Sequence, residues 1–399
     1  TFWNAGITFQ HGGRLVARGT EIDSVKFERV NPTSGTFSGL EFMSPGAATG
    51  TLPPPPPTAT SELMYVAIGE GTGDCADLGC ATIATQNRHI VLIDRSSVRL
   101  SHSGAVHLAA RGSSIAHSRI DTTLSTSYAA LALGPATTAD SVYVYGAGQA
   151  GVFIHGAIAS LADTVRLRNV TIDSSKSVGL WAENGRIVGD SGSVVALRNA
   201  YPFRGYIDNF AVLAKRASEQ VNFLGNVQDV AVIVGRSDRP FRGDLATGKV
   251  DTITVIPELP WEVENDVSFD TLTTFVPQPG ARIGFWSAGM NFQRGAHLIS
   301  RGTNAESIVF EKYSPTSGTF NGIHFQNAPG TAVDTSYVVN TIVRNVEGCK
   351  SGSLACAALS GDNRHVLMLD STRVDSASQA GVALAASGSR ISRSIIHRA

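Results

Sequence analysis

FWNAGITFQHGGRLVARGTEIDSVKFERVNPTSGTFSGLEF, at residues 2–42, returns without a gap at residues 285–325 as FWSAGMNFQRGAHLISRGTNAESIVFEKYSPTSGTFNGIHF. The two stretches are identical at 22 of 41 positions, and most of the other positions keep their character, as in the change from Leu40 to Ile323. An internal repeat of this length constrains the fold before any local pattern does, because each copy must adopt the same structure.

The repeat continues beyond these stretches. NRHIVLID at 87–94 pairs with NRHVLMLD at 363–370, and VHLAARGSSIAHS at 106–118 pairs with VALAASGSRISRS at 382–394. Residues 1 to about 123 therefore correspond to residues 284–399. The chain begins and ends inside a repeat, which we read as a processed or truncated chain.

The local patterns within the repeat predict β-strands. Apolar residues form short runs or alternate with polar ones at 15–17, 25–27, 40–42 and 90–93, and Gly, Asn or Ser follow them. Such runs are typical of strands. Few connecting stretches are long enough for crossover helices, so a sandwich, a barrel or a solenoid remains.

The spacing of these patterns favours a solenoid. Strand patterns opened by a small or aromatic residue begin at Gly104, Tyr128, Gly151 and Gly179, at intervals of 24, 23 and 28 residues. Successive coils of a solenoid stack about 4.8 Å apart and bury each other's apolar faces. The spacing predicts an all-β solenoid with one short junction helix, and the resemblance described below implies that the solenoid is a right-handed parallel β-helix. The inward positions should include the following residues: Val106, Leu108, Val152 and Ile154.

Three regions are expected along the chain. Residues 1–199 form the first copy of the β-helix, residues 200–262 a junction, and residues 263–399 the second, incomplete copy. Within the junction, the spacing of Phe210, Leu213 and Leu224 predicts one short helix at about 208–224, with Asp208 as its N-cap and Gly225 after its end.

The composition excludes several classes of partner. The net charge is −1, from 32 basic and 33 acidic residues, which suggests neither nucleic acid nor an anionic membrane as a partner. No apolar run approaches the roughly 18 residues of a membrane span. Only 16% of the residues are charged, well below the value of typical globular proteins.

A proline-rich segment, TGTLPPPPPTATSE at 49–62, occurs in the first copy only. Five consecutive prolines favour polyproline II, which cannot join a β-ladder, so we expect a stiff projecting loop. Its threonines Thr51, Thr58 and Thr60 are candidates for O-glycosylation, and Asn169 begins an Asn-Val-Thr sequon. An undecorated spacer is the alternative.

Four cysteines occupy matched places. Cys75 and Cys80 precede the first NRH motif, and Cys349 and Cys356 precede the second. Two local disulfides, Cys75–Cys80 and Cys349–Cys356, are the preferred interpretation, and they imply an extracellular or cell-surface location. A zinc site built from all four cysteines, and four reduced buried thiols, remain open.

The region LTTFVPQPGARIGFWSAGMNFQRGAHLISRGTNAESIVF, at 272–310, with its first-copy counterpart, resembles the coil pattern of bacterial surface proteins with a right-handed parallel β-helix, the pectin-lyase-like superfold. The LVARGT and LISRGT elements at 15–20 and 298–303 carry the resemblance. It implies the fold but no activity, because this superfold is shared by lyases, hydrolases, adhesins and inert stalks.

Family enzymes use clustered carboxylates, and polysaccharide hydrolysis needs two positioned carboxyl groups. The nearest candidates are Glu262, Glu264 and Asp266, which alternate on one expected strand and are interpreted as a solvated face. In the NRH motifs, we expect the asparagine to turn the corner and the arginine and histidine to lie outside the strand. No cofactor, metal or catalytic residue is predicted.

The expected function is therefore structural: a subunit or segment of an extracellular filament or cell-surface stalk or adhesin, built from repeats of about 280 residues. Self-association would be head-to-tail, with glycans as possible further partners, and the axial rise would be at most about 60 Å per repeat. The alternative is a carbohydrate-binding or polysaccharide-cleaving β-helix protein.

Overall fold

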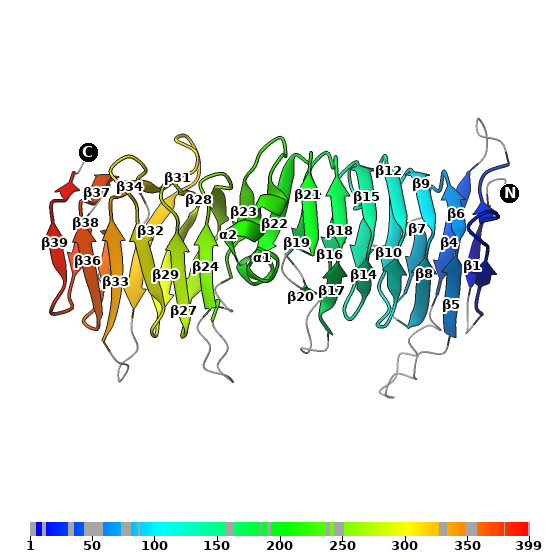
Figure 1. The fold of residues 1–399 in the computed structure, drawn as a ribbon, viewed down its shortest axis with the longest axis horizontal. Helices are drawn as coiled ribbons and strands as arrows, with labels where there is room; N and C mark the ends of the chain where they lie inside the picture. Colours follow the sequence, from blue (N-terminus) through cyan, green and yellow to red (C-terminus); the bar gives the residue numbers. More distant parts are fainter. Residues whose placement is uncertain are drawn as a thin grey trace. The chain divides into compact units, whose positions relative to one another are not determined.

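The fold was obtained as a computed structural model (Figure 1). It describes residues 5–9, 13–30, 36–43, 59–72, 81–86, 88–156, 163–183, 185–189, 193–214, 216–236, 240–242, 251–326, 333–347, 357–378 and 380–397. The chain forms two compact units, which are described separately below. Unit 1 comprises Thr1–Arg204 and Gly225–Gln228, and unit 2 comprises Gly205–Leu224 and Asp229–Ala399.

Unit 1 is a stack of coils, each of which contributes one strand to each of three parallel sheets (Figure 1, blue to green). The first sheet contains β1 (Ala5–Phe9), β4 (Phe37–Phe42), β7 (Ala81–Thr85), β10 (Gly104–Leu108), β13 (Leu131–Leu133), β16 (Val152–Ile154) and β19 (Val178–Ala182). The second contains β2 (Val16–Arg18), β5 (Ala59–Met64), β8 (His89–Asp94), β11 (Ser114–Ala116), β14 (Thr138–Asp140), β17 (Val165–Arg168) and β20 (Ile187–Gly189). The third contains β3 (Val25–Phe27), β6 (Val66–Gly69), β9 (Ser97–Ser101), β12 (Arg119–Thr123), β15 (Tyr143–Ala147), β18 (Val170–Asp173) and β21 (Val194–Leu197).

Unit 2 repeats this architecture, with β22 (Tyr201–Tyr206) leading into it along the chain. One of its sheets contains β23 (Ala231–Val234), β25 (Trp261–Glu264), β28 (Arg282–Trp286), β31 (Ile308–Lys312), β34 (Thr341–Val346), β37 (Arg373–Ala377) and β40 (Ile395–Ile396). Another contains β24 (Asp251–Val255), β27 (Thr273–Pro277), β30 (His297–Arg301), β33 (Asp334–Val339), β36 (His365–Asp370) and β39 (Arg390–Ser392). The last contains β26 (Val267–Phe269), β29 (Ala288–Gln293), β32 (Phe320–Gln326), β35 (Ala357–Gly361) and β38 (Ala380–Leu384).

The predicted all-β fold, a parallel β-helix, is confirmed. All strand pairs within each unit are parallel, and coils pair in register, as where Val106 faces Leu131 and Leu131 faces Val152. The four predicted inward residues, Val106, Leu108, Val152 and Ile154, are fully buried. Side chains of one coil therefore stack on those of the next, and the core is a column of aliphatic and aromatic residues.

The predicted short junction helix is present, but the helical segment is not continuous over residues 208–224. Helix α1 spans Ile207–Leu213, α2 spans Ala217–Gln220, and a 3₁₀ turn follows at Val221–Phe223. The chain leaves the helical conformation at Ala214, and the Glu219 carboxylate accepts a hydrogen bond from the Arg216 N–H at 3.0 Å, which starts a second helix. The N-cap of α1 is Tyr206, and Asp208 lies in the first turn.

The apolar side of this helical segment packs into unit 2. Phe210 is fully buried, and its ring meets Trp261 edge-to-face at 5.6 Å between centroids and Phe223 at 5.8 Å. The described residues include no helix with the length and hydrophobicity needed to cross a bilayer.

The two copies of the repeat match strand by strand. The first twelve strands of the chain, β1 to β12, occupy sequence positions equivalent to those of β29 to β40, in the same order. Their sheets correspond as well: β1, β4, β7 and β10 pair successively in unit 1, as β29, β32, β35 and β38 do in unit 2. The sequence repeat is therefore a structural repeat.

Candidate functional site

One kind of corner recurs at the same point of several coils. A single residue with a left-handed backbone, φ between 44° and 56°, follows the strand and turns the chain into the next sheet. In unit 1 these corner residues are Tyr65, Arg95, His117, Ser141 and Asn169, and in unit 2 they are Asn340, Ser371 and Arg393. Non-glycine residues adopt this conformation at a cost, so neighbouring contacts must hold it.

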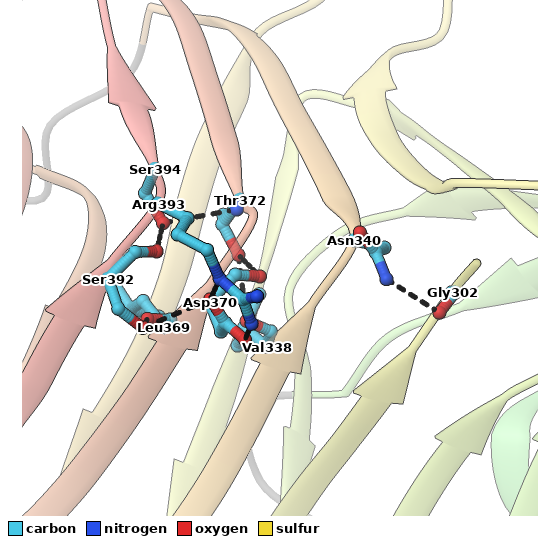
Figure 2. Close-up of polar contacts among 9 residues, drawn as sticks. All are labelled: Gly302, Val338, Asn340, Leu369, Asp370, Thr372, Ser392, Arg393 and Ser394. Carbon is cyan, nitrogen blue, oxygen red and sulfur yellow. Dashed lines mark hydrogen bonds and ion pairs between the residues drawn. The ribbon is translucent and has the colours of Figure 1, made fainter. Parts of the chain in front are cut away.

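A buried hydroxyl after the corner provides one such contact. In the first copy, the Ser96 N–H donates to Ser118 Oγ at 3.1 Å, and Ser118 Oγ donates to the Ala116 carbonyl at 2.6 Å. In the second copy, the Thr372 N–H donates to Ser394 Oγ, also at 3.1 Å. Figure 2 shows this second network, in which Thr372 Oγ1 also donates to the Val338 carbonyl at 2.7 Å. Each hydroxyl thus links successive coils.

An ion pair holds the outer side of the same corner. The Arg393 guanidinium donates from Nε to Asp370 Oδ1 at 2.9 Å, and Ser392 Oγ donates to the same oxygen at 3.0 Å (Figure 2). The hydrogen bond from Arg393 is the main reason why the pKa of Asp370 is lowered to about 2. In the first copy His117 takes the place of Arg393, and its Nδ1 lies 2.9 Å from Asp94 Oδ1. The acid is retained in both copies, and the base differs.

The NRH histidines lie inside the core, so the prediction that they lie outside the strand is wrong. His89 is 2% exposed and His365 is fully buried. Each Nε2 lies 2.8 Å from a buried serine hydroxyl, Ser61 in the first copy and Ser336 in the second. The alternation of HIVLID predicts this position, because the histidine is in phase with the buried second and fourth residues after it.

The serine of each pair also ties a third strand. The backbone N–H of Leu15 donates to Ser61 Oγ, and that of Leu298 donates to Ser336 Oγ, both at 2.9 Å. The imidazole packs against a phenylalanine in each copy in a tilted arrangement, with ring centroids 4.9 Å apart for Phe42 and 4.8 Å apart for Phe325. This backbone–serine–histidine–phenylalanine group is therefore the same in both copies.

Burial shifts the pKa of these histidines. Removal from water lowers the pKa of His365 to about 4, with a smaller contribution from His297, and burial also lowers the pKa of His89. Both rings are therefore neutral at pH 7. Because His365 Nδ1 has no hydrogen-bond partner among the described residues, the tautomer with the proton on Nε2 and a hydrogen bond to Ser336 is the favoured one.

Two further histidines, which the sequence analysis does not single out, lie close together in unit 1. His107 Nε2 and His155 Nε2 are 2.7 Å apart, and burial with the nearby His155 lowers the pKa of His107 to about 4. At this distance one neutral ring donates to the other. No group of three or more His, Cys, Asp or Glu side chains gathers as a potential metal site in the described part of the chain.

The acidic trio does not share one solvated strand face. Glu262 is only 8% exposed, whereas Asp266 lies beyond the left-handed corner at Asn265. The Asp266 carboxylate accepts the Gly289 N–H at 2.8 Å and the Asn321 side-chain amide at 3.2 Å. The strand ends at Glu264, so a period-two pattern could not hold across the corner. Asp266 serves the stacking of coils.

The remaining predicted residues divide into two groups. Asn169 is an exposed corner residue, whose left-handed backbone by itself favours asparagine, and Thr60 is exposed on β5. Thr51, Thr58 and the four cysteines, Cys75, Cys80, Cys349 and Cys356, lie outside the described residues.

The coil formed by β38, β39 and β40 presents apolar side chains to solvent. Ile391 and Ile396 are 44% and 45% exposed, whereas their first-copy equivalents Ile115 and Ile120 are buried. The difference arises because β13 to β15 stack on β10 to β12 in unit 1. We call the β38–β40 surface the end face.

Comparison with known proteins gives no match: neither a family model nor a curated protein matches the sequence.

Proposed function

We propose that this protein is a structural segment of an extracellular repetitive filament or cell-surface stalk, in which repeats of about 280 residues stack as β-helix coils. The observation that supports it best is the equivalence of the two copies in their buried contacts. The hydroxyl and histidine interactions recur between equivalent positions at nearly the same distances. A protein with a single binding or catalytic site would need to keep the contacts of only one copy, whereas a repetitive assembly needs the same buried contacts in every copy.

The end face indicates how such an assembly would join. Because β38 to β40 are equivalent to β10 to β12, the coil that complements them is one equivalent to β13 to β15. We propose that copies of the repeat associate head-to-tail, so that the stacking of coils continues from one copy to the next, either within one polypeptide or between separate chains.

Substitution of the end face tests this arrangement. In the wild-type chain, sedimentation and electron microscopy should detect end-to-end oligomers, with an axial period of at most about 60 Å per repeat. Ile396→Asp should shift the population to monomers, whereas Val227→Asp, at an 81% exposed position outside the first and last coils, should not. An Ile396→Asp variant that assembles as the wild type does would refute assembly through this face, and a wild-type chain that remains monomeric would refute association between separate chains.

The enzyme reading is tested separately. Incubation with acidic polysaccharides and calcium, followed by detection of unsaturated products, would reveal a lyase, and release of reducing ends would reveal a hydrolase. We expect neither product. Glu262→Gln and Glu264→Gln should leave any trace signal unchanged, and a large loss of turnover in either variant would contradict the structural function.

An extracellular location is part of the proposal. It rests on the matched cysteine pairs of the sequence, since disulfides persist in oxidising compartments.

A further inference from the structure

Unit 2 carries an exposed aromatic pair that the proposed function does not require. Trp286 ends β28, and Tyr313 follows β31. The two strands are neighbours, and the register that pairs Phe285 with Lys312 brings both residues to the same level. Their ring centroids are 6.4 Å apart at an angle of 61°, and each residue is 39% exposed. Large aromatic side chains left this exposed are candidate contact residues.

The backbone around the pair holds both rings in place. A Cβ added at Gly284 would lie 2.9 Å from Tyr313 Cδ2, so the ring of Tyr313 lies across the glycine. Gly318, at φ +76°, lies against Trp286, because its Cβ would be 3.5 Å from Trp286 Cδ2. Each ring therefore lies against backbone atoms and is partly exposed, an arrangement that costs little ordering entropy when a ligand binds.

The chemistry of such a pair suits a proline-rich segment. Polyproline II is preformed, exposes flat apolar rings, and leaves its backbone carbonyls without internal hydrogen bonds. Grooves lined by tryptophan and tyrosine bind it by packing the rings between the aromatics, and an indole N–H can donate to a proline carbonyl. The same chain contains such a segment, Pro53–Pro57, in a stretch, 49–58, that has no charged residue.

The two copies of the repeat divide these elements between them. The tryptophan occurs in both, as Trp3 and Trp286, but the equivalent of Tyr313 in the first copy is Val30. Conversely, the five prolines occur only in the first copy. The copy that has the complete aromatic pair is thus the copy that lacks the prolines, which is the distribution expected of a receptor and its ligand.

We propose that Pro53–Pro57 of one chain binds to the Trp286–Tyr313 pair of a second copy of this chain. This contact is distinct from stacking at the end face, since it involves the outer face of a sheet. It would join neighbouring chains side by side, or in staggered order, in addition to the end-to-end contact.

Peptide titration of the full chain tests the contact. The receptor is a ¹⁵N-indole-labelled chain with Pro54→Ala, Pro55→Ala and Pro56→Ala, so that its own prolines do not compete. Indole signals of the four tryptophans are assigned by Trp→Phe substitution. A synthetic peptide of residues 50–59 should shift the Trp286 signal and leave those of Trp181 and Trp261 unchanged. The same peptide with alanine at all five proline positions should cause no shift.

A matched pair of variants locates the binding energy. Tyr313→Ala should weaken the peptide at least about tenfold, as removal of a central aromatic contact does. Tyr145→Ala removes a side chain of the same exposure, 39%, from unit 1 and should leave the affinity unchanged.

Three results would overturn the proposal: no shift of Trp286 with the proline peptide, an equal shift with the alanine peptide, or a shift with a neutral glucose hexamer but not with the peptide. The last would reassign the aromatic pair to saccharide binding. Failure here would leave the end-face contact standing, because the Ile396→Asp variant tests that contact separately.

Discussion

Replacement of the buried His365 should remove part of the acid sensitivity of the fold. The ordinary pKa of histidine is 6.5, and burial lowers that of His365 to about 4. Above pH 6.5 the ring is neutral in both the folded and the unfolded chain. As the pH falls from 6.5 to 4, the unfolded chain binds a proton that the folded chain does not bind, so the free energy of unfolding decreases. Below pH 4 both states are protonated and the decrease ends.

The size of the effect follows from the two pKa values. The difference between the two pKa values corresponds to a maximal decrease of about 3 kcal/mol in the free energy of unfolding. About 2 to 3 kcal/mol of this decrease has occurred when the pH reaches 4.5. His365→Gln cannot take up the proton, yet its amide can still donate to Ser336. The variant should therefore be less stable than the wild type at pH 7 but lose about 2 to 3 kcal/mol less between pH 7 and pH 4.5.

Urea unfolding followed by circular dichroism at both pH values measures this difference, and hydrogen exchange of the Leu298 amide, which donates to Ser336, localises it. His102→Gln provides the control, because His102 is exposed and should show the wild-type dependence on pH. If His365→Gln and the wild type lose the same stability on acidification, the reasoning from burial is wrong.

Three further predictions concern the repeat. Ser118→Ala should lower the free energy of unfolding by about 1–3 kcal/mol, because it leaves the buried Ser96 N–H without its acceptor. Ser394→Ala should lower it by less, because Ser394 is only half-buried, and equal losses in urea unfolding would contradict this reasoning. Gly39→Ala and Gly322→Ala should each cost more than about 1 kcal/mol, since φ is +105° and +94° and the new Cβ would lie 2.5 Å from the Thr82 carbonyl oxygen or 2.7 Å from that of Ala357. Gly69→Ala should be tolerated, because the nearest neighbour of its Cβ would be Glu28 Cβ at 4.0 Å, and similar melting temperatures for all three variants would refute the argument. Mass spectrometry of the unreduced protein should find Cys75 linked to Cys80 and Cys349 linked to Cys356, each stabilising by at most about 3 kcal/mol, and free thiols or a Cys75–Cys349 link would disprove the pairing.

The fold could be predicted from the sequence because its signals are periodic. The repeat of 41 aligned residues, the coil spacing and the alternation around Val106 and Val152 all depend on residue type and order, which the sequence contains in full. Stacked coils bury the same face at every turn, so each signal recurs and the inward positions follow. Local propensity and long-range packing agree in such a fold.

The errors occurred where a contact between coils decides the structure. The helix over 208–224 breaks at Ala214, and the Glu219 carboxylate restarts it through a hydrogen bond whose geometry no helical periodicity reveals. The expectation that His89 lies outside its strand is wrong because its phase in HIVLID places it inside, where the Ser61 hydroxyl from the neighbouring coil makes the burial of the imidazole tolerable. The partner of a buried polar group is set by coil stacking, which one strand's sequence does not contain.

The two copies differ in length without differing in strands. The separation between equivalent residues changes from 283 at Phe42 and Phe325 to 275 at Ala59 and Asp334, so the first copy holds eight more residues between β4 and β5. Parallel pairing continues in register on both sides of this insertion. Such a connection is a natural acceptor for foreign sequence, where a peptide epitope or an enzyme recognition tag could be grafted while the ladder of hydrogen bonds stays intact. What the surface displays can therefore change, in evolution or in the laboratory, independently of the framework that carries it.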